Sequence, residues 1–229
     1  MILQFKDVVL GYENKTVAKD INFEIKKGDY LCIVGENGAG KSTLVKTLLG
    51  LIKLLSGKIT INLDKSKKGI GYLPQQTVAQ KDFPASVMEV VLSGFLNSGH
   101  KSPFYSKKEK AEALSNMDKL GIAYLKKRCY RELSGGQQQR VLCATDNLLI
   151  LDEPVTGLDP SASIDLYDEI KKLNNEGVTI IMVTHDIKNA LSYASHILHL
   201  EQGKEFFGTV KEYKKSKISD SFLAGGQND

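Results

Sequence analysis

A glycine-rich loop near the N-terminus constrains this chain more than any other segment. It follows an apolar run, Leu31 to Val34, that is typical of a buried strand, and it precedes Leu44 to Leu49, which predicts a helix. Glycines at this spacing let the backbone fold around phosphate oxygens, Lys41 reaches the β- and γ-phosphates, and the Ser42 hydroxyl faces Mg²⁺. The N-terminal N–H groups of the following helix point at the same anion. The sequence therefore predicts a nucleoside triphosphate site with these candidate residues: Gly35, Asn37, Gly38, Gly40, Lys41, Ser42 and Thr43.

Length and composition are those of an ordinary globular chain. The 229 residues are 41% hydrophobic and 25% charged, which suits one larger domain with a sizeable core. No apolar run approaches the roughly 18 residues that span a bilayer, and charges interrupt the N-terminus too early for a signal peptide. Cys32, Cys129 and Cys143 form no C-x-x-C pair and suit reduced thiols. We expect an intracellular protein that is soluble unless a partner holds it at a membrane. No nucleic-acid partner is expected, because the net charge is only +4 and the sequence has no ribonucleoprotein aromatic motif, zinc knuckle or long basic helix.

Alternation of apolar and polar residues before the glycine-rich loop predicts an N-terminal antiparallel sheet. The two candidate strands are Ile2 to Leu10 and Asp20 to Ile25. Further strands are expected at Lys58 to Leu63 and at Gly71 to Leu73.

A helical pattern then replaces the strands after Pro74. Capping boxes at Ser86 to Glu89 and at Ser106 to Glu109 predict two helices, so we expect a helical insert over roughly Thr77 to Glu132. Strands and helices are then expected to alternate again up to the C-terminal part of the chain. Residues 225–229 are expected to form a flexible tail. The later elements are predicted as a strand at Leu148 to Leu151, a helix capped by Asp159 with Pro160 at its first position, a strand at Val178 to Val183, and a strand pair near Ile197 and Phe206.

A second nucleotide signature ends the apolar strand that begins at Leu148. Asp152 closes this strand as a carboxylate that can hold Mg²⁺ directly or through water, the pattern of a Walker B motif. Glu153 follows directly, where a carboxylate can orient or deprotonate a water that attacks the γ-phosphate.

A third motif, Leu133 to Gln137, distinguishes this chain from other triphosphate-binding proteins. Its Ser134, Gly135 and Gly136 open a helix with a hydroxyl and backbone N–H groups, a second anion cradle. Together with the other two motifs it closely resembles the signature of the ABC transporter ATPases, over essentially the whole chain. The resemblance implies a single nucleotide-binding domain over residues 1–229, of the α/β P-loop NTPase class. Its parallel-sheet core would carry an N-terminal antiparallel β subdomain and an inserted α-helical subdomain.

The resemblance also implies roles for individual residues. Tyr12 matches the aromatic residue that stacks on adenine, and Gln75 matches the residue that contacts Mg²⁺ or the attacking water, although Gln76 competes for that position. Asp159 corresponds to an aspartate that communicates across the dimer, and His185 to a histidine that contacts the γ-phosphate. Two copies of the chain would clasp ATP head to tail, with Ser134, Gly135, Gly136 and Gln137 of one copy completing the site of the other.

The resemblance further implies a transport function. The segment from Asp82 to Gly94 resembles the zinc and manganese uptake branch, with siderophore and cobalamin importers next. We therefore expect an ATP-hydrolysing subunit at the cytoplasmic face of the cell membrane, bound to integral permease subunits and served indirectly by an extracytoplasmic substrate-binding protein. Two alternatives stay open: a non-transport ABC ATPase, and an ATP-binding module with impaired hydrolysis.

The second alternative arises from one departure from the family pattern. About five residues are missing between Arg140 and the strand at Leu148, which corresponds to ~7.5 Å of helix. The shortening is natural, is engineered, or reflects residues left out of the sequence. A different interpretation, a metal site at His196 and His199, is not favoured, because strand positions three apart face opposite sides.

Overall fold

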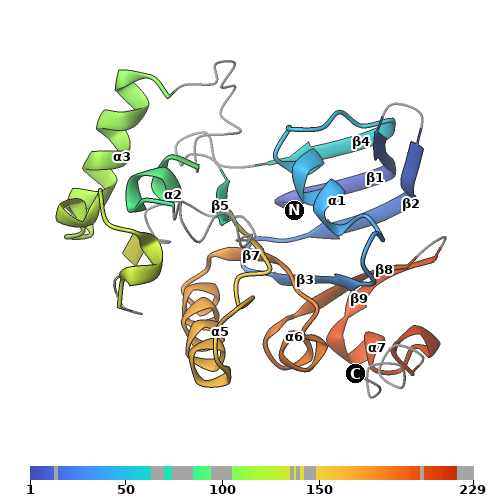
Figure 1. The fold of residues 1–229 in the computed structure, drawn as a ribbon. Coiled ribbons are helices and arrows are strands. Elements are labelled where there is room, and N and C mark those ends of the chain that lie inside the picture. Colours follow the sequence, from blue (N-terminus) through green and yellow to red (C-terminus); the bar gives the residue numbers. More distant parts are fainter. Residues whose placement is uncertain are drawn as a thin grey trace. The chain divides into compact units, whose positions relative to one another are not determined.

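The computed structural model describes most of the chain, and Figure 1 shows its ribbon. The described residues are 1–12, 15–62, 70–73, 85–93, 105–134, 137, 140–141, 148–201 and 204–220. They form two compact units, Met1–Ile61 with Met182–Asp229, and Asn62–Ile181, which are taken in turn below. In these ranges, no helix has the length and apolar character required to cross a membrane.

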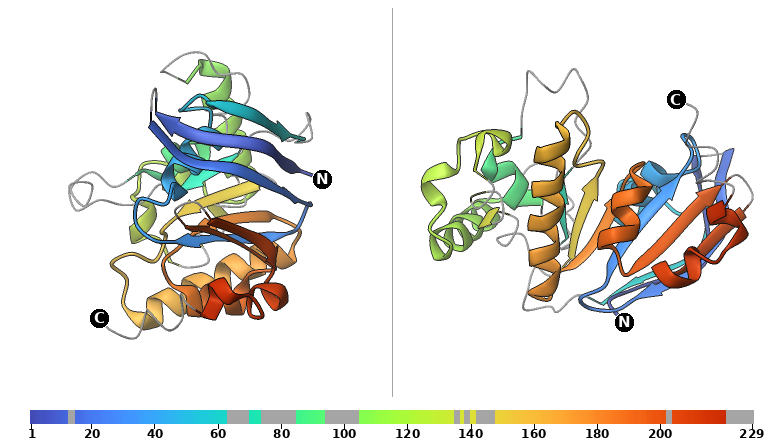
Figure 2. Two further views of the ribbon diagram at one scale, coloured as in Figure 1. Left: turned by 90° about the vertical axis from the view of Figure 1, so that its right-hand side faces the viewer. Right: turned by 90° about the horizontal axis from the view of Figure 1, so that it is seen from below.

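An antiparallel sheet dominates the N-terminal part of the first unit. Strand β1 (Leu3–Tyr12) lies between β2 (Lys15–Ile25) and β4 (Ser56–Ile61), visible as the blue and teal arrows of Figures 1 and 2. Phe5 pairs with Phe23 across the two strands, and their rings stack with centroids 4.4 Å apart. Aromatic pairs of this kind stabilise a sheet face beyond the area they bury. The predicted antiparallel sheet is confirmed.

A second sheet segment in the same unit positions the glycine-rich loop. All six residues of β3 (Tyr30–Gly35) are buried, and this strand pairs in parallel with β8 (His196–Glu201), which pairs antiparallel with β9 (Lys204–Thr209). The glycine-rich loop connects β3 to α1 (Lys41–Leu48). The shorter helices α6 (Ile187–Tyr193) and α7 (Val210–Tyr213) complete the unit.

The second unit contains the other nucleotide signatures. Strands β5 (Gly71–Leu73) and β6 (Leu148–Asp152) pair in parallel, and β6 is buried throughout. The helices of this unit are α2 (Val87–Ser93), α3 (Lys107–Lys119), the 3₁₀ turns η2 (Ala123–Leu125) and η3 (Tyr130–Glu132), and α5 (Pro160–Asn175). Strand β7 (Thr179–Val183) leads the chain from this unit into the first.

The expected secondary structure agrees closely with these bounds. Both capping boxes form, with Glu89 accepting from the Ser86 N–H at 2.7 Å and Glu109 from the Ser106 N–H at 2.7 Å. The largest difference is at β2, which begins at Lys15 rather than at Asp20. Register shifts interrupt its pairing with β1, and they hide the simple alternation on which the prediction depended. The expected tail at 225–229 lies outside the described residues.

Candidate nucleotide site

The glycine-rich loop begins at a point where only glycine fits. Gly35 has a φ of 137°, and a Cβ at this position would collide with the carbonyl oxygen of Leu200 on the neighbouring strand β8. Gly40, at the other end of the loop, has a φ of 104° and is the N-cap of α1. The backbone therefore turns sharply at both ends, as a loop that wraps a phosphate requires.

The start of α1 has the features of an anion site. No side chain caps Gly40, and the first N–H groups of any α-helix lack partners within the helix. Lys41 is only 6% exposed, and its ammonium donates to the carbonyl oxygens of Gly35 at 2.7 Å and Glu36 at 2.8 Å. A buried cation thus lies in the first turn of α1 at the end of the glycine-rich loop, an arrangement that favours polyanions such as the phosphates of a nucleotide.

Tyr12 lies close to this helix and presents its ring to solvent. The side chain is 47% exposed, and its hydroxyl is 3.5 Å from the Thr43 hydroxyl in α1. An exposed aromatic ring beside a phosphate site can stack on a base. The structure therefore brings together Tyr12, the loop glycines, Lys41 and Thr43, all of which the sequence had grouped as candidates.

His185 belongs to the first unit and follows the end of β7. The preceding Thr184 is buried, and its N–H donates to the carbonyl oxygen of Ile33 in β3 at 3.2 Å. The Thr184 hydroxyl also accepts from the Asp186 N–H at 3.0 Å. These bonds fix the backbone on both sides of His185, whose side chain is exposed.

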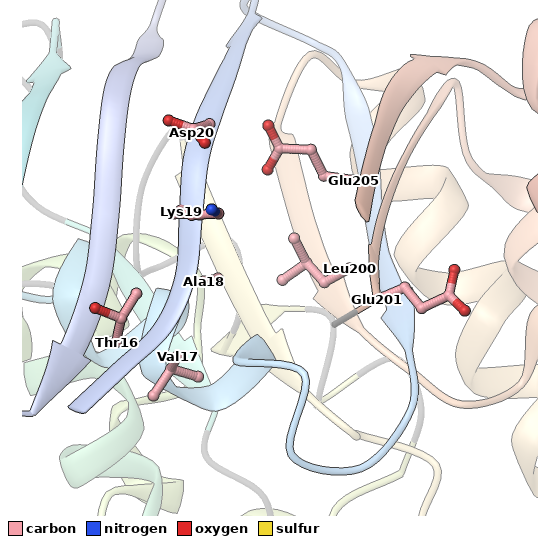
Figure 3. Close-up of a pocket in the computed structure, with 8 residues that line it drawn as sticks. All are labelled: Thr16, Val17, Ala18, Lys19, Asp20, Leu200, Glu201 and Glu205. Atoms are coloured by element: carbon pink, nitrogen blue, oxygen red, sulfur yellow. The ribbon is translucent and has the colours of Figure 1, made fainter. Parts of the chain in front are cut away.

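A pocket of about 210 Å³ adjoins the loop and was not predicted from the sequence. Figure 3 shows Glu205 extending from β9 toward Asp20 on β2. Burial, and then the Asp20 carboxylate, raise the pKa of Glu205 to about 7. Two lining residues of β2 are also neighbours of Gly40, since a Cβ there would lie 3.0 Å from Val17 and 3.5 Å from Ala18. The sequence offered no signal, because the carboxyl groups come from strands far apart in the chain.

The Walker B carboxylates lie at the end of β6 in the second unit. Asp152 is 6% exposed, and its Oδ2 is 3.5 Å from the hydroxyl of Tyr72 on the neighbouring strand β5. Burial is the main reason that the pKa of Tyr72 is raised, followed by the Asp152 charge, so the phenol remains a donor. Motif spacing could not identify this contact, which depends on the pairing of two strands.

Glu153 has an unusual backbone conformation. Its φ is 49°, in the left-handed region that residues other than glycine rarely adopt. The Thr156 hydroxyl donates to Glu153 Oε2 at 3.2 Å, and the Thr156 N–H donates to its carbonyl oxygen at 3.2 Å. Strained backbone of this kind is often found at functional residues, because the surroundings hold a side chain in one required direction.

The signature motif is described only in part. Gln137 accepts from the Ser134 N–H at 3.1 Å and donates to the Tyr124 hydroxyl at 3.3 Å. Tyr124 is 71% exposed, and Ser134 is also exposed. Gly135 and Gly136 lie outside the described residues, as does Gln75.

Asp159 has the predicted capping role. It is exposed, and its Oδ1 accepts from the Ala162 N–H at 3.0 Å at the start of α5, where Pro160 is the first helical residue. This hydrogen bond lies within one chain, so the role of Asp159 in a dimer stays a prediction.

The two histidines of β8 have structural partners. His199 is buried with its Nδ1 2.7 Å from the Tyr213 hydroxyl, while His196 Nδ1 lies 2.9 Å from the Ser195 hydroxyl. No group of three or more potential metal ligands occurs within the part of the chain that the structure describes. The structure thus gives no support to a metal site on this strand.

Comparison with known proteins gives the family. Residues 18–156, which span the glycine-rich loop, the signature motif and Walker B, match the ABC transporter family. The chain belongs to this family. As an ABC ATPase domain it binds and hydrolyses ATP. One relative is the manganese transport system ATP-binding protein MntB of Bacillus subtilis, 35% identical over 247 aligned residues that cover 99% of each chain. The zinc uptake system ATP-binding protein ZurA of Listeria innocua is 34% identical, covering 93% of this chain and 88% of its own.

A solved structure supports the same assignment. The chain CbiO1 of Clostridium perfringens, part of an ABC transporter complex, has a TM-score of 0.64 and 27% identity, over 99% of this chain and 95% of its own. The ABC ATPase fold class is therefore established. The MntB alignment is also longer than the 229 residues of this chain, so the relative has residues without a counterpart here. Residues 142–147, where the link after Arg140 is expected to be short, lie outside the described part, so the shortening stays a prediction.

Proposed function

We propose that this chain is the ATP-hydrolysing subunit of a membrane ABC transporter that imports a divalent metal ion such as zinc or manganese. The observation that carries the proposal is the buried Lys41, the first residue of α1, at a helix N-terminus that has no side-chain cap and directly follows the glycine-rich loop. The choice of cargo is supported by the relatives, since MntB is named for manganese transport and ZurA for zinc uptake. A non-transport ATPase has no comparable support.

The proposed chemistry begins with binding of ATP in the first unit. Lys41 and the N–H groups of the loop and of α1 would hold the phosphates, and Tyr12 would stack on adenine. The candidate loop residues are Gly35, Asn37, Gly38, Gly40, Lys41, Ser42 and Thr43.

Mg²⁺ fits the donor set at the proposed site. The Ser42 hydroxyl, the Asp152 carboxylate and the Gln75 amide are oxygen ligands of the kind that Mg²⁺ prefers. When bound, Mg²⁺ would neutralise charge on the β- and γ-phosphates. Asp152 is buried at the end of β6, where its carboxylate would provide one of these oxygen ligands.

The proposed hydrolysis depends on residues from several sequence motifs. Glu153 would orient the attacking water and accept its proton, with His185 and Gln75 aligning that water. Ser134, Gly135, Gly136 and Gln137 of a second copy would bind the γ-phosphate in a head-to-tail homodimer, and Asp159 would communicate between the two sites. The domain would bind permease subunits at the cytoplasmic face of the cell membrane and respond indirectly to an extracytoplasmic binding protein. Nucleic acid is not among the proposed partners.

Substitution of the proposed base tests this assignment. Glu153→Gln should lower steady-state turnover by about 100-fold or more, because the amide cannot accept the proton. ATP affinity should remain, so ATP-bound dimer should accumulate in gel filtration. Glu176→Gln, which changes an exposed acid beyond α5, serves as the control. Robust multiple turnover by Glu153→Gln would remove Glu153 from this role.

The cargo is tested in cells that lack the gene for this chain. Restoring the unmodified chain should restore accumulation of zinc or manganese under metal limitation, measured by elemental analysis, while Glu153→Gln should not. Unchanged contents of both metals would reject metal import and leave the ATPase activity standing.

A further inference from the structure

Tyr72 connects two parts of the second unit that are distant in the sequence. Its side chain reaches Asp152, with the phenolic oxygen 3.5 Å from Oδ2, which is longer than the roughly 2.5–3.0 Å of an ordinary O–H···O hydrogen bond. The parallel pairing of β5 with β6 sets this approach, because Tyr72 lies opposite Ile150, two residues before the carboxylate. The ring therefore approaches the Walker B carboxylate from the neighbouring strand.

The backbone of Tyr72 is held from another direction by α2. The Ser93 hydroxyl, in the last residue of this helix, accepts from the Tyr72 N–H at 3.0 Å. The Ser93 hydroxyl can donate its single proton to either of two carbonyl oxygens, that of Val90 at 2.6 Å or that of Tyr72 at 3.0 Å. Ser93 is buried, so these bonds do not compete with bulk water. Figure 1 shows α2 beside β5.

We propose that Tyr72 is a positioning residue that orients Asp152 and transmits a displacement of α2 to this carboxylate. The inference rests on the proposed role of Asp152 as a cation ligand. Groups that hydrogen-bond to a ligating carboxylate fix its orientation, and their removal commonly weakens metal binding. A phenol at the limit of bonding distance is sensitive to small shifts, because hydrogen bonds weaken steeply as their geometry worsens. A movement of α2 at Ser93 would therefore change how firmly Asp152 is held.

Metal affinity provides a direct measurement. Mn²⁺, as a paramagnetic substitute for Mg²⁺, is titrated into protein saturated with a non-hydrolysable ATP analogue, and free Mn²⁺ is measured by electron paramagnetic resonance. Tyr72→Phe should raise the Mn²⁺ dissociation constant by about tenfold, since it removes the hydroxyl and retains the ring. Nucleotide affinity measured in EDTA should not change, because Lys41 and its loop are untouched. Loss of both affinities would indicate general damage and would overturn a specific positioning role.

The matched control removes a different buried hydroxyl. Tyr130→Phe changes a phenol in η3 of the same unit that lies near Glu169 rather than Asp152. We expect no change in Mn²⁺ affinity for this variant, and thermal unfolding of every variant shows whether the fold is retained. Equal weakening by Tyr72→Phe and Tyr130→Phe would reject the inference.

The connection to α2 is tested by Ser93→Ala. This variant should weaken Mn²⁺ binding in the same direction as Tyr72→Phe, and the double variant should lose less than the two separate losses combined. Strict additivity, or no effect of Ser93→Ala, would overturn transmission from α2.

Asp152→Asn distinguishes the proposed metal-binding role of Asp152 from the positioning role of Tyr72. If this variant binds Mn²⁺ normally, the proposed function of Asp152 is wrong. If Asp152→Asn weakens binding and Tyr72→Phe does not, the proposed function stands and the role of Tyr72 is rejected.

Discussion

Individual carboxylates in this protein owe their properties to their structural surroundings, whether the neighbours are local or distant in the sequence. Glu153 is held in a left-handed backbone conformation, with its side chain bonded to Thr156. Asp20 also has a positive φ, of 60°, and lies with Glu205 at the pocket beside β2. The orientation and ionisation of a carboxylate in this protein thus depend on the local backbone and the surrounding charge as well as on residue type.

Glu205 should make stability depend on pH. Burial and the Asp20 charge raise its pKa from 4.5 to about 7, so the folded state retains a proton that the unfolded chain has released within this window. The free energy of unfolding should therefore decrease as pH rises from about 4.5 to about 7. Glu205→Gln removes the ionisation and should raise the melting temperature above that of the unmodified chain at about pH 8.

The same variant should have little effect in acid. Below the window the Glu205 carboxyl is protonated in both states, so its stabilising contribution is fully present and an amide is a close substitute. Glu24→Gln, an exposed position on β2, controls for the general loss of a negative charge. A melting temperature difference for Glu205→Gln that is constant across pH would show that its ionisation is not responsible.

At the scale of elements, helix ends determine how the catalytic motifs are presented. Capping side chains at Ser106 and Asp159 begin α3 and α5, and the glycine cap of α1 leaves its N-terminus available to an anion. The capped and uncapped helices differ in their capacity to bind an anion, because a side-chain cap satisfies the same N–H groups that a phosphate would otherwise bind. Helix α1, which follows the phosphate loop, therefore keeps its first N–H groups available to an anion.

Asp159 combines a capping role with a proposed dimer role, and two substitutions separate them. Asp159→Ala removes the bond from the Ala162 N–H and should lower the free energy of unfolding by about 1 kcal/mol. Asp159→Asn should retain stability, because asparagine caps as well as aspartate, but it removes the charge. Chemical denaturation measures the first effect and steady-state ATPase activity the second.

The expected pattern is a stable Asp159→Asn variant with reduced turnover. Ser106→Ala, which removes a cap on α3 from a residue with no proposed role in the dimer, should lower stability without lowering the turnover of the folded protein. Full ATPase activity of Asp159→Asn would limit Asp159 to capping.

At the scale of the whole molecule, the proposed site is shared between two copies. Lys41→Ala should inactivate the site that a chain contributes directly, and Ser134→Arg should inactivate the site that it completes in its partner. Each variant alone should therefore lack turnover. An equal mixture should regain about a quarter of the unmodified activity, because half of the dimers would contain one intact site.

Complementation is measured as ATPase activity against the fraction of each variant at constant total protein. Activity should be maximal at equal amounts and vanish at either end. A mixture that stays inactive while heterodimers form would contradict completion of the site by the second copy. Gel filtration of differently tagged chains verifies that heterodimers are present.

Local sequence patterns were sufficient to predict most of the secondary structure. The bounds of β3, α2 and α3 follow from short apolar runs and capping boxes, whose causes lie within a few residues. The start of β2 was missed because bulges depend on the partner strand. Motif spacing likewise grouped Lys41 with its loop, since the loop is contiguous in the chain.

The sequence by itself determined that a triphosphate-binding loop, a Walker B strand and a signature motif occur in this chain, and with them the family. Tertiary structure decided which groups surround these motifs: Leu200 against Gly35, Tyr72 against Asp152, and Asp20 beside Glu205 at one pocket. The reason is that strand pairing and burial act between segments far apart in the chain. Spacing along the sequence carries no information on such distances, whereas the orientation and pKa of a side chain depend on them.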